Sequence, residues 1–97
     1  MSNLSQFGGG GIKSIQRGTI AVTLTSGIGT NTATITAVTT SKSTIEFLGA
    51  TVGSALGLPI GARVALTNGT TVTADAYGGN GTTGPIVTVG YQVVEYL

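Results

Sequence analysis

Hydrophobic and β-branched residues alternate with polar residues along most of this 97-residue chain. In the segment 17–25 (RGTIAVTLT), Ile20, Val22 and Leu24 fall on one face, while threonine and alanine fall on the other. Residues i and i+2 share a face in an extended strand, so this pattern predicts a β-strand with one buried face. No part of the chain shows a convincing helical period, and the pattern therefore favours an all-β fold.

Five further segments predict strands by the same alternation. They are 32–40 (TATITAVTT), 44–50 (TIEFLGA), 62–67 (ARVALT), 70–76 (TTVTADA) and 86–97 (IVTVGYQVVEYL), the last with Gly90 as a candidate bulge. The glycines within 26–31 predict a turn, and the polar stretch 40–43 separates the second strand from the third. Six strands of this kind predict a small antiparallel β-sandwich or barrel.

Glycine, proline and asparagine mark the other connections. Asn68-Gly69 lies between two alternating runs, and this pair accepts the positive φ of a type I′ turn, so a hairpin is expected there. The segment 51–61 (TVGSALGLPIG) is apolar but contains Pro59, which predicts a loop with one helical turn at 54–56. The segment 77–84 (YGGNGTTG) predicts a second long loop.

Four consecutive glycines, 8–11, precede the sequence IKS. A phosphate-binding loop needs glycine directly before its lysine and again five residues earlier, but Ile12 and Phe7 occupy these two positions. The glycines are therefore interpreted as a hinge. Residues 1–11 are expected to form a flexible arm with Leu4 and Phe7 as apolar anchors for a partner, and residues 12–97 a β-domain.

The chain has few charges: four basic and three acidic side chains, 7% of all residues, against about 25% in ordinary soluble domains. No basic cluster indicates a nucleic-acid partner, and neither a polybasic helix nor an apolar run of about 20 residues indicates a membrane. A small core without tryptophan or disulfides leaves a thin stability margin. A homo-oligomer that buries further surface is therefore expected.

Catalytic chemistry is disfavoured by the residues that the chain lacks. Without histidine or cysteine, it has no ligands for a zinc-type site and no base for a Ser–His or Cys–His nucleophile. Glu46 and Asp75 form an acid/base pair only if the fold brings them together, and exposed strand positions explain them more simply. The sequence predicts no enzyme, no metal and no cofactor.

Three other residues are candidates for binding a partner. Lys13 and Arg17 are two of the four cations, and they lie where the arm meets the first strand. They either keep an edge strand soluble or anchor the chain to an acidic neighbour. Tyr77, at the start of the glycine-rich loop, is a weak candidate for a sugar-binding platform. The glycosylation triplets at Asn68 and Asn80 are more simply turns, and the Thr-x-Thr pairs more simply reflect β-propensity than an ice-binding array.

Several segments resemble, in order, a group of short proteins of tailed bacteriophages. The segments are IKSIQRGTI (12–20), ATITAV (33–38), EFLGA (46–50), ARVALTNGTTVTA (62–74) and YQVVEYL (91–97). The first is the most distinctive, because an IKSIQRG start is frequent in these phage proteins. The resemblance covers nearly all of the β-domain and implies a small virion structural protein without catalytic residues.

Phage decoration (cement) proteins are similar in plan, since they are typically trimers of β-domains that clamp capsomers with arms and loops. The resemblance therefore implies a homotrimer on the capsid exterior, bound to the major capsid protein or another virion protein. The alternative is a tail-fibre, spike or baseplate module that binds a host-surface glycan, for which the 77–84 segment is the only support.

Overall fold

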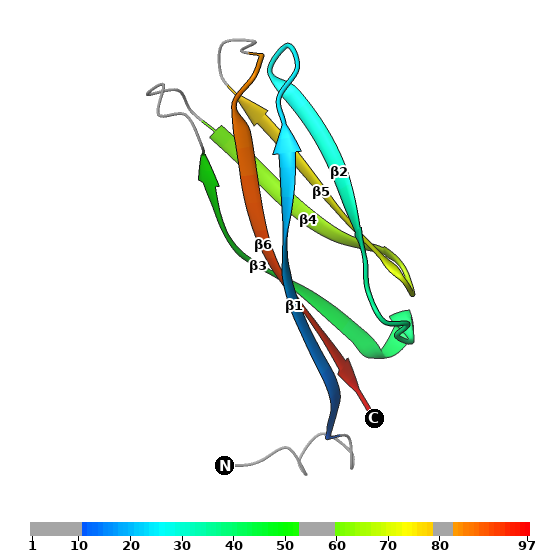
Figure 1. The fold of residues 1–97 in the computed structure, drawn as a ribbon. Helices are drawn as coiled ribbons and strands as arrows, with labels where there is room; N and C mark the ends of the chain where they lie inside the picture. The colour runs from blue at the N-terminus through cyan, green and yellow to red at the C-terminus, as the bar shows by residue number, and fades with distance from the viewer. Residues whose placement is uncertain (1–10, 53–59, 79–82) are drawn as a thin grey trace.

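The computed structural model describes residues 11–52, 60–78 and 83–97, and these residues form two antiparallel sheets packed face to face (Figure 1). One sheet has the order β1–β6–β3 and the other the order β2–β5–β4. The strands are β1 (Ile12–Thr23), β2 (Ile28–Thr34), β3 (Ser43–Val52), β4 (Ile60–Asn68), β5 (Thr71–Gly78) and β6 (Ile86–Tyr96). A 3₁₀ turn, η2 (Thr40–Lys42), precedes β3. The predicted all-β sandwich is confirmed.

The core lies between the sheets and is built from alternate residues of the strands. Its central strands are β6 and β5, each flanked on both sides by another strand. The buried hydrophobic side chains facing each other there are Ile20, Val22, Leu24, Ile35, Val72, Ala74, Ala76, Val87, Val89, Tyr91 and Val93. Full burial of one such valine, leucine or isoleucine contributes about 1.5–3 kcal/mol, so this row supplies the main stabilisation of the fold.

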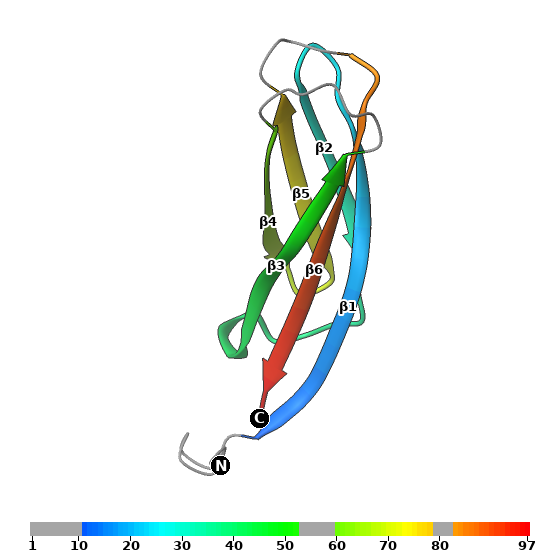
Figure 2. The ribbon, with the colours of Figure 1, turned by 90° about the vertical axis from the view of Figure 1, so that its left-hand side faces the viewer.

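The β1–β6–β3 sheet is the longer of the two. At the end where β1 begins and β6 ends, it extends past the β2–β5–β4 sheet (Figures 1 and 2). The principal extents of the molecule are 48 × 26 × 15 Å, and its radius of gyration is 15.7 Å, against about 13 Å for a compact domain of this size. No strand of the other sheet lies opposite this extension within the described residues, and the segment between β2 and β3 covers part of it.

The first turn is shorter than the sequence predicted. Thr25 and Ile28 exchange two backbone hydrogen bonds, of 2.8 and 3.1 Å, across only two residues. Those two, Ser26 and Gly27, have φ values of 53° and 82°, as a type I′ turn requires. The turn predicted within 26–31 is therefore present, but it is confined to Ser26-Gly27, and β2 begins at Ile28.

The predicted type I′ turn at Asn68-Gly69 is wrong, although the hairpin itself, β4 followed by β5, is present. Neither residue has a positive φ. The Asn68 Oδ1 atom accepts a hydrogen bond from the Thr70 N–H at 2.9 Å. The carbonyls of Gly69 and Thr70 accept hydrogen bonds from the N–H groups of Val38 and Ile35, at 2.8 and 2.9 Å. Contacts with a distant segment therefore fix this turn.

The second predicted strand, 32–40, ends early at Thr34 because the next residues bond elsewhere. Besides the two bonds from Ile35 and Val38, the Gln16 side chain pairs with the backbone of Thr36. Its Nε2 donates to the Thr36 carbonyl at 2.9 Å, and its Oε1 accepts from the Thr36 N–H at 2.8 Å. Side chains and a turn thus satisfy the backbone that a strand neighbour would otherwise pair.

The bulge predicted at Gly90 of β6 lies instead in the neighbouring strand, β3. Gly90 stays in regular register with Thr19, while β3 carries the extra residue, Leu48, between Phe47 and Gly49. Gly49 has a φ of 112°, and a Cβ at Gly90 would lie 3.3 Å from that of Leu48. The missing side chain at Gly90 therefore makes room for the bulge on the opposite strand.

Both predicted long loops are shorter where the structure describes them. Thr51 and Val52 belong to β3, and Ile60 and Gly61 belong to β4. Tyr77 and Gly78 belong to β5. The helical turn predicted at 54–56 and the arm residues Leu4 and Phe7 lie outside the described residues.

Candidate binding surfaces

The outer face of the β1–β6–β3 sheet carries a polar row across all three strands. Arg17 pairs in register with Gln92, which pairs in turn with Glu46. The Arg17 Nε donates to the Gln92 side-chain carbonyl, and the Gln92 amide nitrogen donates to the Glu46 carboxylate. Hydrogen bonds thus link the three side chains, which form what we call the polar rung.

Apolar side chains lie on both sides of the polar rung. Ile15 pairs with Val94 in the preceding outward-facing row, and it is 45% exposed. Leu48 lies beside Gly90 in the following row, and it is 54% exposed. Outward-facing rows along a strand are about 6.8 Å apart, so these hydrophobic groups closely flank the rung. The result is a surface of exposed apolar side chains, which we call the apolar surface, with hydrogen-bonded polar side chains at its centre.

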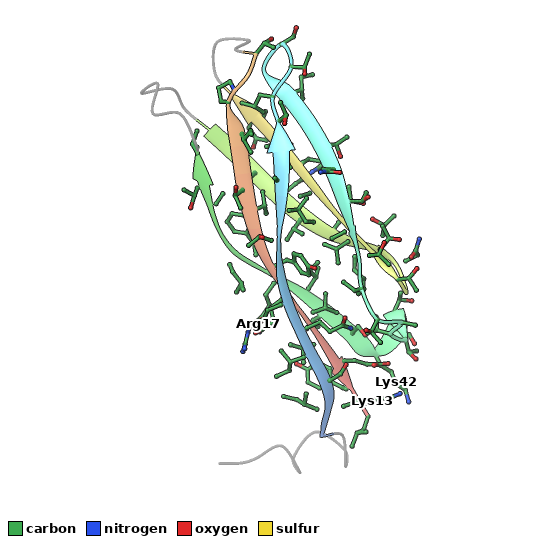
Figure 3. All side chains as sticks on the ribbon, viewed as in Figure 1. Lys13, Arg17 and Lys42 are labelled. Carbon is green, nitrogen blue, oxygen red and sulfur yellow. The ribbon has the colours of Figure 1, made fainter. Side chains whose placement is uncertain are left out.

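The predicted cations Lys13 and Arg17 do not act together. Figure 3 shows their side chains pointing to different sides of β1. Lys13 Nζ lies 3.9 Å from the Glu95 carboxylate, next to the segment before η2, whereas Arg17 joins the polar rung on the outer face. Arg17 is therefore placed on the apolar surface, and Lys13 has a local partner within the chain.

Glu95 is buried, at 4% exposure, and holds the segment before β3 against the sheet. Its carboxylate accepts a hydrogen bond from the Thr39 N–H at 2.8 Å and one from the Ser14 hydroxyl at 3.4 Å. The Thr39 backbone bond, then the charge of Lys13, lowers the pKa of Glu95 below its ordinary 4.5, against an opposing effect of desolvation. With Gln16, this carboxylate anchors the connection between β2 and β3.

A second surface lies on the outer face of the β2–β5–β4 sheet. Tyr77 pairs in register with Gly61 of β4 and Ile28 of β2. A Cβ at Gly61 would overlap the Tyr77 ring, so the ring lies across this glycine, yet Tyr77 is 57% exposed. The sequence predicts Tyr77 at the start of a loop, but the structure places it in β5.

Charged and polar groups occupy the row next to Tyr77. The Arg63 Nε donates to the Asp75 Oδ2 at 3.0 Å. Hydrogen bonding from Thr30, then from Arg63, lowers the pKa of Asp75 below its ordinary value. A shallow depression of about 550 Å³ is lined by Ile28, Thr30, Arg63, Asp75, Ala76 and Tyr77. No pattern in the sequence associates Arg63 or Thr30 with Tyr77.

Glu46 and Asp75, the two carboxylates considered as an acid/base pair, lie on the outer faces of different sheets. They therefore do not face each other. Within the described ranges, no three acidic side chains gather where they would hold a metal ion. The same residues contain no helix long and apolar enough to cross a membrane.

A scan against protein-family models gives no match, and searches of curated proteins and of solved structures find no significant match.

Proposed function

We propose that this chain is a structural protein of a tailed-bacteriophage virion, a decoration protein that binds the major capsid protein and stabilises the head. The phage-like segments from IKSIQRG to YQVVEYL support the virion assignment. The proposal rests on the outer face of the β1–β6–β3 sheet, where Ile15 and Leu48 are exposed beside the polar rung.

This surface suits a protein partner better than a small ligand. A partner that covers it gains apolar burial at Ile15 and Leu48. Since Arg17, Gln92 and Glu46 already pair with one another, covering them leaves fewer polar groups without a hydrogen bond. Apolar area and arginine are both enriched at protein–protein interfaces.

In this proposal the chain forms a homotrimer, as the resemblance to decoration proteins implies. The arm 1–11 makes a second contact to the capsid through Leu4 and Phe7. Each contact is weak by itself. Attachment through several linked copies raises the overall affinity, because every binding event after the first is intramolecular. The proposed mechanism is therefore multivalent clamping of neighbouring capsomers.

The proposal is tested on purified capsids that lack the chain, by measuring how tightly added full-length protein binds. The double variant Ile15→Asp/Leu48→Asp should bind at least tenfold more weakly, because each lost apolar contact is worth roughly 1.5–3 kcal/mol, or about tenfold or more in Kd. Deletion of residues 1–11 should also release the protein, and the bound wild type should raise the temperature at which capsids open.

Ala65→Asp is the matched control, because Ala65 is an exposed strand residue on the outer face of the other sheet. It should bind capsids like the wild type. Circular dichroism establishes that each variant is folded. Equal binding of the folded double variant and the wild type would overturn the assignment of this surface to the capsid.

A further inference from the structure

We propose that the depression around Tyr77 is a carbohydrate-binding site, in which one neutral sugar ring stacks on Tyr77 and hydrogen-bonds to Arg63 and Asp75. This site lies on the opposite sheet from the proposed capsid surface, and it does not depend on the role in the virion.

The Tyr77 ring packs against the backbone of Gly61 and forms a platform. One of its faces covers Gly61, where any side chain would collide with the ring, and Ile28 lies in the same row on the other side. Packing over Gly61 accounts for the buried face of the ring. It does not account for the exposure of more than half of the residue. A ring that is ordered before binding offers apolar area to a ligand at low entropic cost.

The neighbouring row supplies both kinds of hydrogen-bonding group. Arg63 points a donor at Asp75 through Nε, and its side chain is 78% exposed. Its terminal nitrogens make no hydrogen bond to any described residue. Asp75 is half-buried and uses Oδ2 for this pair. A sugar hydroxyl both donates and accepts, so adjacent hydroxyls fit a guanidinium beside a carboxylate.

The spacing and the charge favour a neutral sugar over other ligands. The row of Arg63 and Asp75 is about 6.8 Å from the row of Tyr77, which is close to the width of one sugar ring with its hydroxyls. Asp75 neutralises Arg63, so the site does not select a phosphate. Among the residues that the structure describes, Tyr77 is the only aromatic side chain lining the depression, whereas the recognition of quaternary ammonium groups uses aromatic cages.

The size of the depression sets the expected affinity. About 550 Å³ is within the range of small-molecule sites, but the depression is shallow and covers one side of a ligand. For a single sugar, ordinary binding free energy per atom then gives a Kd of about 1 mM or weaker. A polysaccharide presented to several copies of the chain would be held much more tightly.

The test is an NMR titration of the isotope-labelled full chain with D-glucose, D-galactose, D-mannose and N-acetyl-D-glucosamine, each taken to tens of millimolar. A second series uses purified bacterial lipopolysaccharide, which separates a surface glycan from a free sugar. We expect at least one of these probes to shift the amide signals of Gly61, Arg63, Asp75 and Tyr77. Tyr77→Ala should weaken that binding at least tenfold, and Tyr77→Phe by no more than about threefold, because the ring face remains.

Arg63→Ala provides a second variant in case Tyr77→Ala fails to fold, and it should weaken binding about fivefold or more. Thr34→Ala, on the same outer face but outside the depression, is the control and should bind like the wild type. Absence of shifts at these residues with every probe overturns the proposal, and so do shifts that persist in both Tyr77→Ala and Arg63→Ala. Capsid binding by Tyr77→Ala should equal that of the wild type, so the failure of one proposal is distinguishable from that of the other.

Discussion

Single polar residues at inward-facing positions hold the segment between β2 and β3 over the end of the long sheet where β1 begins and β6 ends. Ser14 and Gln16 continue the inward-facing series of Ile20 and Val22, and Glu95 continues that of Val93. Polar residues in an otherwise apolar series are the sequence signal for this anchoring. Gln16 and Glu95 bond to backbone groups of the segment between β2 and β3, and no local pattern indicates which segment that is.

Glu95 should make stability depend on pH. Its folded pKa is below the ordinary 4.5, so the ionised carboxylate stabilises the fold at higher pH. This contribution is lost as the pH falls from about 4.5 through the lowered pKa. Glu95→Gln should therefore lower the urea midpoint at pH 7, and clearly less so at pH 3.

Asp75→Asn is the comparison for this prediction, because Asp75 also has a lowered pKa but is more exposed. It should show the same trend with a smaller amplitude. If the difference between the urea midpoints of wild type and Glu95→Gln were the same at every pH, the role given to Glu95 would be contradicted.

At the scale of the elements, the alternation pattern predicted the existence of all six strands, but the positions of the hairpin turns were not predicted correctly. The hairpin of β4 and β5 shows why. A two-residue turn at Asn68-Gly69 would pair Arg63 with Ala74 and so place apolar and polar residues on one face. The observed hairpin turns at Gly69-Thr70 and has a register shift between Leu66 and Asn68, which pairs Arg63 with Asp75 instead. The phase of alternation on the two strands already contained this information.

The bulge in β3 should depend on the backbone freedom of Gly49. Its φ is 112°, and a Cβ there would meet nothing within 4 Å, so substitution strains the backbone without a collision. Gly49→Ala should lower the free energy of unfolding by roughly 1–2 kcal/mol. It should also weaken capsid binding, because the bulge directs Leu48 to the outer face.

Gly11→Ala is the matched control for Gly49→Ala. Gly11 has no positive φ, and the new Cβ would make an ordinary contact of 3.4 Å with Leu97. Chemical denaturation of both variants should show a change within about 0.5 kcal/mol for Gly11→Ala. An equally small change for Gly49→Ala would show that the bulge does not need glycine.

At the scale of the whole molecule, the sequence did not predict which strands form each of the two sheets. The first strand pairs with the last, and β3 joins them, so the polar rung unites residues 17, 46 and 92. Periodicity identifies which residues are buried within each strand, but it carries no information on which strands are neighbours. The two candidate surfaces, on opposite outer faces, therefore became visible only in the structure.

The proposed role in the virion is tested most directly by the number of copies of this chain in each phage particle. Quantitative mass spectrometry of purified particles gives this number relative to the major capsid protein. A decoration protein should be present at a level comparable with the major capsid protein, because it occupies sites repeated over the whole head. A few copies per particle would contradict the proposal and place the chain in the tail.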